Sequence, residues 1–382
     1  MARIVNISNF KRSFDGGVCR VSADVDGAEV WFESSDVALN TFPEAFATAF
    51  LIPALSQGAA LRSSSPLSPR WQRNCAMLMG IVREWWGYQP QSPQSGGEWR
   101  QTPSTPRRTA LCFSGGVDSF YSLFHGYTTV DALVMVHGYD IQLCDDIRGA
   151  GAIKSLRAVA SDLSLHSIVI RTNLRLHPLF RAVAWSRTHG GGLAAIGHLL
   201  RDQYSQLVIS SSQPYCSSVG LGSHWRIDEL WSNEHLHVSH VGAWALRNEK
   251  LREIAHHYLV RKHLRVCWKN LEPEGNCGRC EKCLRTMLIL ETCHELKKYD
   301  VFPARDILLQ NLNRLSSIED TNLFLVYREI LGHELSPELR AAVMNLLSRS
   351  EQRHRQARQF EVRLLKGLKR WLSYRVGALL RA

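Results

Sequence analysis

The sequence predicts an α/β protein with a doubly wound, mostly parallel sheet at its centre. From residue 109 onward, apolar runs of strand length alternate with helical segments, as in "ALVMVHG" followed by "IRGAGAIKSLRAVASDLS". Several runs are apolar throughout, as expected of strands whose two faces are both covered. A short glycine-containing stretch, "SGGVDS", directly follows the first of these runs. Together these observations favour repeated strand–helix units.

The composition is that of a soluble protein of more than one domain. The chain has 382 residues, of which 45% are hydrophobic and 21% are charged, and both fractions are ordinary for globular proteins. No apolar run approaches the roughly 20 residues that a membrane-spanning helix needs. The start, "MARIVNISNF", lacks the apolar core of a signal peptide. We therefore expect a cytoplasmic protein.

Changes in composition predict three domains. Residues 1–105 carry short β-type runs and two helical stretches, which predict a small N-terminal α+β domain whose role the sequence does not indicate. The Pro-, Gly-, Ser- and Gln-rich stretch "GYQPQSPQSGGEWRQTPSTPRR" is typical of a linker and ends this domain. The α/β domain is expected at 106–292, and a helical extension at 293–382.

The C-terminal extension carries most of the net charge. Residues 349–382 contain ten Lys or Arg and two Glu, a balance of +8 out of +11 for the chain. A predicted helix at about 350–380 has an apolar stripe that includes Phe360, Leu364 and Trp371, and a basic opposite face. Three interpretations stay open: packing on the body of the protein, binding to an anionic membrane surface as a peripheral protein, or binding to nucleic acid.

The stretch "SGGVDS" has the features of an anion-binding loop. Glycines let the backbone approach a phosphate closely, and a helix N-terminus presents N–H groups and a positive dipole end. Asp118 suits such a site if Mg²⁺ accompanies the phosphates. The loop matches neither GxxxxGK[ST] nor GxGxxG, and a plain capped turn between strand and helix is the alternative.

The loop resembles the pyrophosphate-binding loop of the N-type ATP pyrophosphatases, which share SGGxDS after the first strand. The resemblance implies an adenine nucleotide alpha hydrolase-like, Rossmann-like fold, with ATP and Mg²⁺ as cofactors. It implies attack of a substrate oxygen on the α-phosphate of ATP, release of pyrophosphate, and displacement of AMP by a nitrogen or sulfur nucleophile. The residues that it assigns to the nucleotide are Ser114, Gly115, Gly116, Val117, Asp118 and Ser119, with Asp118 and Ser119 also taking part in catalysis.

Four clustered cysteines predict a metal site. Cys277, Cys280 and Cys283 form two overlapping CxxC steps, and Cys267 precedes Cys277 with nine residues between them. In a cytosolic chain this spacing favours a closed tetrahedral Zn²⁺ site over disulfide bonds. An iron–sulfur cluster, which also takes four thiolates, is the alternative.

The loop and the cysteine segment with the trailing Arg285 are together similar to 7-cyano-7-deazaguanine synthase. The similarity covers residues 108–292 and leaves both ends of the chain outside it. It implies an ATP-dependent carbon–nitrogen ligase that forms AMP and pyrophosphate. The substrate would be a small-molecule or sugar carboxylate or amide, and ammonia or an amine would come from solution or from a partner protein. A homodimer is kept as an option.

Further candidate residues follow the later strands. His137, Gly138 and Asp140 come after the second strand, and the resemblance places that segment near the nucleotide, with a simple turn as the alternative. Arg247 and Lys250 lie one helical turn apart, so both can face one phosphate region and stabilise the leaving pyrophosphate, or pair with Glu249 or Glu253 instead.

Two more features concern the substrate. The long loop after the fourth strand is a candidate lid, and it contains Ser223, His224 and Asp228. His189 is either a structural histidine or a base.

Three alternative functions remain. A sugar amidotransferase for a surface polysaccharide would suit a tail that lies on a membrane. A tRNA thiolation enzyme would need an iron–sulfur cluster or a reactive thiol, for which Cys112, Cys144 and Cys216 are the candidates. A non-catalytic nucleotide-binding module of a defence system would bind ATP without releasing pyrophosphate.

Overall fold

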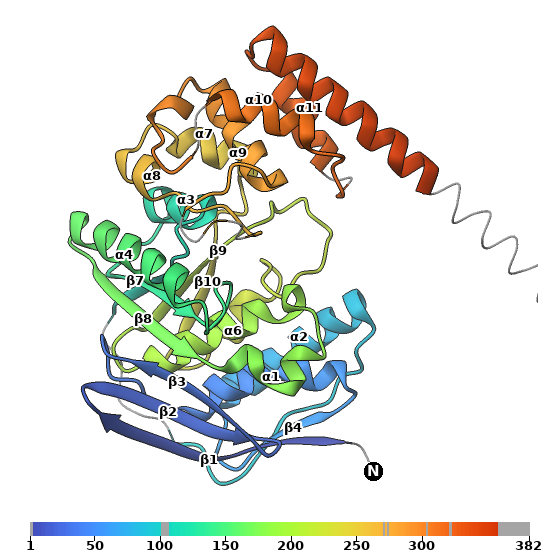
Figure 1. Ribbon diagram of the computed structural model, residues 1–382. Coiled ribbons are helices and arrows are strands. Elements are labelled where there is room, and N and C mark those ends of the chain that lie inside the picture. The colour runs from blue at the N-terminus through green and yellow to red at the C-terminus, as the bar shows by residue number, and fades with distance from the viewer. Residues whose placement is uncertain are drawn as a thin grey trace, which may run out of the picture. The chain divides into compact units, whose positions relative to one another are not determined.

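The computed structural model describes residues 3–100, 107–269, 272, 275–302, 305–320 and 323–357 (Figure 1). The chain divides into two compact units, and the second begins at Cys267. This division differs from the expected boundaries near residues 105 and 292. The N-terminal region and the region of alternating strands and helices lie in the first unit, and the cysteine cluster lies in the second.

The first unit is built on a mixed sheet that contains ten strands within the described residues. In sheet order the strands are β10 (His237–Val241), β9 (Gln206–Ser210), β6 (Thr109–Cys112), β7 (Ala132–His137), β8 (His166–Thr172), β3 (Ala28–Ser34), β2 (Val18–Val25), β1 (Ile4–Asp15), β4 (Ala60–Ser63) and β5 (Gln94–Ser95). The five strands from β10 to β8 are mutually parallel. The expected α/β class is therefore confirmed.

The helices of the first unit connect or cover these strands (Figure 1). They are α1 (Pro43–Ser56), α2 (Pro69–Trp86), α3 (Val117–His125), α4 (Asp146–Asp162), η1 (Leu174–Leu176), α5 (Pro178–Arg181), α6 (Trp185–Leu200), η2 (Asp228–Trp231), α7 (Arg247–Ile254) and α8 (Tyr258–His263).

The parallel strands have two buried faces. Ala110, Val134 and Ile209 point to one face and belong to the core that α1 and α6 also form, whereas the alternate residues Leu111 and Val208 are buried on the other face. The helices α1 and α6 pack closely, because a Cβ at Gly191 would lie 2.8 Å from the carbonyl oxygen of Thr48. Burial on both faces explains why these strands are apolar throughout.

The N-terminal strands continue the same sheet. Strand β3 pairs antiparallel with β8, and Phe32 lies opposite Thr172. The hydroxyl of Ser34 donates to the carbonyl oxygen of Val169 at 2.8 Å, and the amide of Trp31 donates to Asn173 Oδ1 at 2.9 Å. An unpaired edge of β8 would leave backbone groups without partners, and β3 satisfies them. Residues before the linker therefore complete the sheet instead of forming a core of their own.

The second unit is helical where the structure describes it outside the cysteine segment. Its helices are α9 (Glu281–Thr292), η3 (Leu296–Lys298), α10 (Arg305–Arg314) and α11 (Leu323–Leu331), and residues 337–357 are also helical. The side chain of Tyr327 is buried and donates to Glu281 at 3.2 Å, which joins α11 to α9. Most of the predicted basic helix, including Phe360, Leu364 and Trp371, lies outside the described residues. Within the described part of the chain, no helix is long and apolar enough to cross a membrane.

Candidate functional site

The "SGGVDS" loop lies at the carboxyl end of β6, where the order of the parallel strands reverses. Strand β6 is flanked by β7, which is the next strand in sequence, and by β9, which follows β8. Helix α3 begins at Val117, directly after Gly116, so the loop residues lie at a helix N-terminus. Carboxyl ends of parallel strands are where open α/β sheets bind ligands.

The backbone of the loop is shaped by its glycines. Gly115 has a φ of +71°, in the left-handed region that other residues rarely adopt. The amide of Gly116 donates to Ser114 Oγ at 3.3 Å, and a Cβ on Gly116 would lie 3.2 Å from that oxygen. The carbonyl oxygen of Gly115 accepts from the amide of Arg265 at 2.8 Å. These contacts fix the backbone of the turn directly before the helix N-terminus, which is the part of a helix that binds anions.

Two of the predicted loop residues face into the protein. Ser119 is buried, and its hydroxyl donates to the carbonyl oxygen of Gly116 at 3.0 Å. The side chain of Val117 is also buried. The side chains of both residues therefore stabilise the first turn of α3. Only their backbone N–H groups could contact a ligand.

The structure brings Asp118 together with both predicted cations of α7. Arg247 lies 3.0 Å from Asp118 Oδ2, and Lys250 Nζ lies 3.3 Å from Asp118 Oδ1. Glu249 instead accepts a hydrogen bond from the amide of Leu246 at 2.7 Å and so caps its own helix. The pairing with Glu249 or Glu253 that the sequence left open is therefore not what the structure shows for Arg247 and Lys250.

Lys250 is almost completely buried. Its side chain is 1% exposed, and Nζ also donates to the carbonyl oxygen of Ser211 at 2.7 Å, directly after β9. Burial lowers the pKa of Lys250, and the charge of Asp118 opposes this shift. A buried cation that is held between a carboxylate and a carbonyl is costly to build, which favours a functional role.

The three predicted residues at the end of β7 contact residues other than those of the loop after β6. His137 is buried and its Nε2 lies 3.0 Å from the carbonyl oxygen of Gln142. Gly138 has a φ of +113°, and a Cβ there would lie 2.1 Å from the carbonyl oxygen of Thr172. Asp140 is exposed and accepts from Trp185 Nε1 at 3.1 Å. None of the hydrogen bonds among described residues joins these three to the loop after β6.

The loop after β9, which is the candidate lid, packs against α6 and forms an ion pair with α2. A Cβ at Gly222 would lie 2.4 Å from the carbonyl carbon of Arg187 on α6. Arg226 makes a two-pronged ion pair with Glu84 of α2, at 2.9 Å for each nitrogen. The second half of this segment is therefore packed in place.

A buried polar cluster gathers around Asp228, which is 0% exposed. Its carboxylate accepts from the Ser223 hydroxyl at 2.7 Å, from the His224 amide at 3.2 Å, and it lies 2.7 Å from His240 Nδ1. The sequence predicted Ser223, His224 and Asp228 in one loop but missed His240. The available signal was the polar pair Ser239–His240, which lies between the apolar residues Val238 and Val241.

The charge of Asp228 also affects the pKa values of two more titratable groups, Cys112 and His189. Burial and the nearby carboxylate raise the pKa of the Cys112 thiol to about 12. Burial lowers the pKa of His189, and the charges of Asp228 and Asp140 oppose that shift. The thiol of Cys112 is therefore protonated near neutral pH, and the thiolate is the reactive form of cysteine.

The four predicted metal ligands lie together in the second unit. Cys267, Cys277, Cys280 and Cys283 are buried, and their sulfur atoms lie within 4.8 Å of one another. The amides of Arg279 and Cys280 donate to the Cys277 sulfur at 3.5 and 3.3 Å, as in a tight knuckle. A hydrogen bond from Cys283 lowers the pKa of Cys280 to about 5, which favours a thiolate. This arrangement of donors fits one metal ion such as zinc.

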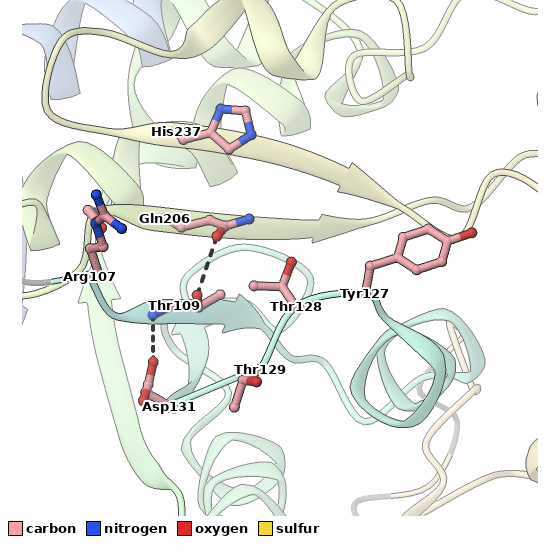
Figure 2. A pocket seen from close by; sticks show the side chains of 9 residues that line it. Arg107, Thr109, Tyr127, Thr128, Thr129, Asp131, Gln206 and His237 are labelled. Carbon is pink, nitrogen blue, oxygen red and sulfur yellow. Dashed lines mark hydrogen bonds between the residues drawn. The ribbon is translucent and has the colours of Figure 1, made fainter.

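A separate shallow pocket of about 570 Å³ lies at the opposite end of the strands (Figure 2). It is lined by Thr109, Gln206 and His237, which are the first residues of β6, β9 and β10. The amide of Thr109 donates to Asp131, another residue of the lining, at 2.7 Å. The pocket therefore lies away from the loop that follows β6.

Comparison with known proteins finds no matching family model, no matching curated protein and no matching solved structure.

Proposed function

We propose that this protein is an ATP-dependent carbon–nitrogen ligase of the N-type ATP pyrophosphatase kind, similar to 7-cyano-7-deazaguanine synthase. The observation that carries the proposal is the position of Asp118. It lies within "SGGVDS", in the first turn of α3 at the carboxyl end of β6, and two cations from α7 converge on it. The parallel strands are ordered β10-β9-β6-β7-β8, and the reversal of this order at β6 supports a nucleotide at this edge of the sheet.

The loop would hold the phosphates of ATP through its backbone. The N–H groups at the start of α3 and the helix dipole attract anions, and the hydroxyl of Ser114 adds a further donor. Mg²⁺ beside Asp118 would neutralise part of the phosphate charge. Arg247 and Lys250 would stabilise the negative charge that develops on the leaving pyrophosphate.

The reaction would proceed in two steps. A carboxylate or amide oxygen of the substrate attacks the α-phosphate, and the bond to pyrophosphate breaks. Ammonia or an amine then attacks the activated carbon, and AMP leaves. The site supports this order because the cations lie beside the loop, where the leaving pyrophosphate would be held.

The cysteine centre would be structural. Four buried sulfur ligands fill a tetrahedral site and leave no open position for a substrate. Zinc there would fix the segment before α9 and contribute to the stability of the second unit.

The thiolation alternative is less well supported. Without an iron–sulfur cluster it needs a thiolate near the nucleotide, yet burial and Asp228 raise the pKa of Cys112 to about 12. The other two candidate thiols, Cys144 and Cys216, are exposed.

The test is release of AMP and pyrophosphate from MgATP with ammonium and a panel of carboxylates that includes 7-carboxy-7-deazaguanine. Release that depends on one carboxylate would support the ligase and identify its acceptor. ATP binding without turnover on any acceptor would favour a nucleotide-binding module. Formation of ADP and phosphate would contradict the proposed role of the loop.

A further inference from the structure

The ring of His240 is held in one orientation by Asp228. Nδ1 lies 2.7 Å from Asp228 Oδ2, and the side chain of His240 is 3% exposed. Because a carboxylate only accepts hydrogen bonds, Nδ1 is the nitrogen that donates to Asp228, and Nε2 is the ring nitrogen that is left to accept a proton. Within the part of the chain that the structure describes, Nε2 of His240 makes no hydrogen bond. The ring is therefore oriented as a proton acceptor.

The carboxylate that orients this ring is itself fully satisfied. The Ser223 hydroxyl and the His224 amide donate to Asp228 from the preceding loop, at 2.7 and 3.2 Å. Those bonds fix the carboxylate without using Nε2 of the histidine. A buried carboxylate that orients an imidazole is the arrangement found in hydrolases, where it selects the tautomer and stabilises the imidazolium.

Strand register places the dyad close to the loop that follows β6. His240 pairs with Ile209 of β9, and the next residue, Val241, accepts at its carbonyl oxygen from the Ser211 amide at 2.8 Å. Ser211 is the residue whose carbonyl oxygen holds Lys250. Extending the register across β9 sets His240 in line with Cys112, the last residue of β6 before the loop. Strand β9 lies between β10 and β6, so these two strands are about 10 Å apart, which is within the length of a bound substrate.

We propose that His240, positioned by Asp228, is the general base that takes a proton from the attacking nitrogen in the second half-reaction. This inference rests on the proposed ligase function and names a residue for its transfer step.

The proton balance of the step is simple. Ammonium gives one proton to Nε2, and the resulting ammonia attacks the acyl carbon of the adenylated substrate. The carbon–nitrogen bond forms, the carbon–oxygen bond to AMP breaks, and its electron pair leaves on AMP. A second proton passes from nitrogen to water as the intermediate collapses, and the imidazolium then returns its proton to solvent.

The experiment compares two nucleophiles in the full-length protein with MgATP and 7-carboxy-7-deazaguanine. Ammonia is mostly protonated near neutral pH and needs a base, whereas hydroxylamine is mostly unprotonated and does not. His240→Asn keeps a donor to Asp228 and removes the base. It should slow AMP formation with ammonium by about a hundredfold or more, while the rate with hydroxylamine stays close to that of the wild type.

A second variant tests the role of Asp228 without removing the ring. Asp228→Asn can donate to Nδ1 and so places the ring proton on Nε2, which should produce the same selective loss. His237→Asn is the matched control, because His237 lies on the same strand with an exposed ring. It should leave both reactions unchanged.

The outcomes separate the two claims. Equal loss with both nucleophiles in folded His240→Asn and Asp228→Asn variants, or no loss with either, overturns the role of His240 and leaves the ligase standing. A wild-type protein that forms no AMP with this acceptor or with any other carboxylate of the panel overturns the ligase, and the role of His240 with it.

Discussion

Lys250 Nζ lies 3.3 Å from Asp118 Oδ1 although 132 positions separate the two residues in the chain. The contact joins the first turn of α3 to α7 and places a buried cation beside the loop that follows β6. Arg247 reaches the other carboxylate oxygen at 3.0 Å. The helix dipole already stabilises a carboxylate at a helix N-terminus, so stability alone does not require two additional cationic partners. Their presence favours a role in function.

Replacing Asp118 tests this centre. Asp118→Asn keeps the size of the side chain but leaves Lys250 buried without its counter-charge. We expect loss of substrate-dependent pyrophosphate release by about two orders of magnitude or more, and a loss of stability of about 2–4 kcal/mol, measured by urea unfolding. Asp146→Asn, in the exposed first turn of α4, is the control. Equal activity of the two variants would remove Asp118 from the site.

The stability of the protein should depend on the protonation of Lys250. Burial lowers the pKa of Lys250 from its ordinary value of 10.5. Between the folded and unfolded pKa values the unfolded chain binds more protons, so this group makes the folded state more stable as pH rises toward 10.5. The ionisation of Lys250 lowers the free energy of unfolding by its full amount below the pKa of the folded state. This unfavourable contribution disappears above the pKa of the unfolded state.

Lys250→Met should remove this alkaline increase. The difference in the free energy of unfolding, wild type minus variant, should rise with pH in a series of urea titrations from neutral to alkaline pH. Other titrating groups are common to both proteins and cancel in the difference. A difference that is constant with pH would show that Lys250 has an ordinary pKa.

The local chemistry of this protein is more predictable from sequence than its long-range contacts. The Cys280 and Cys283 ligands follow from spacing, because two CxxC steps can close only around a small centre. The turn at Gly115 follows from residue types that tolerate a positive φ. Arg247 and Lys250 face the same region because they are one helical turn apart. The sequence did not reveal that both form ion pairs with Asp118.

The remaining features depend on strand order. Sequence gives no means of knowing that β3 would pair with β8, so the N-terminal region was expected to be a separate domain. His240 went unnoticed because its partner, Asp228, lies 12 positions earlier in η2, and the two side chains come together only in the folded chain. Neighbours that are created by pairing across a sheet leave little trace in a single sequence.

Two glycines with similar φ angles allow the effect of backbone strain to be distinguished from a role in binding phosphates. Gly115 and Gly17 have φ values of +71° and +81°. An alanine at either position should cost about 1–2 kcal/mol of stability, because left-handed backbone brings Cβ close to the carbonyl oxygen. Only Gly115→Ala should weaken binding of a non-hydrolysable ATP analogue, measured by calorimetry. If both variants bind the analogue like the wild type, the loop does not hold phosphates.

The last prediction concerns the cysteine centre. Cys283 is 0% exposed in the first turn of α9, so Cys283→Ser should lose the bound metal and loosen the second unit. Elemental analysis should find about one zinc per wild-type chain and almost none in the variant, and hydrogen exchange in α9 should accelerate. Cys144→Ser, at an exposed thiol of the first unit, should keep both the metal and the protection. A brown protein with visible absorption and iron in place of zinc would assign the four thiolates to an iron–sulfur cluster, and would make the thiolation reaction the stronger candidate.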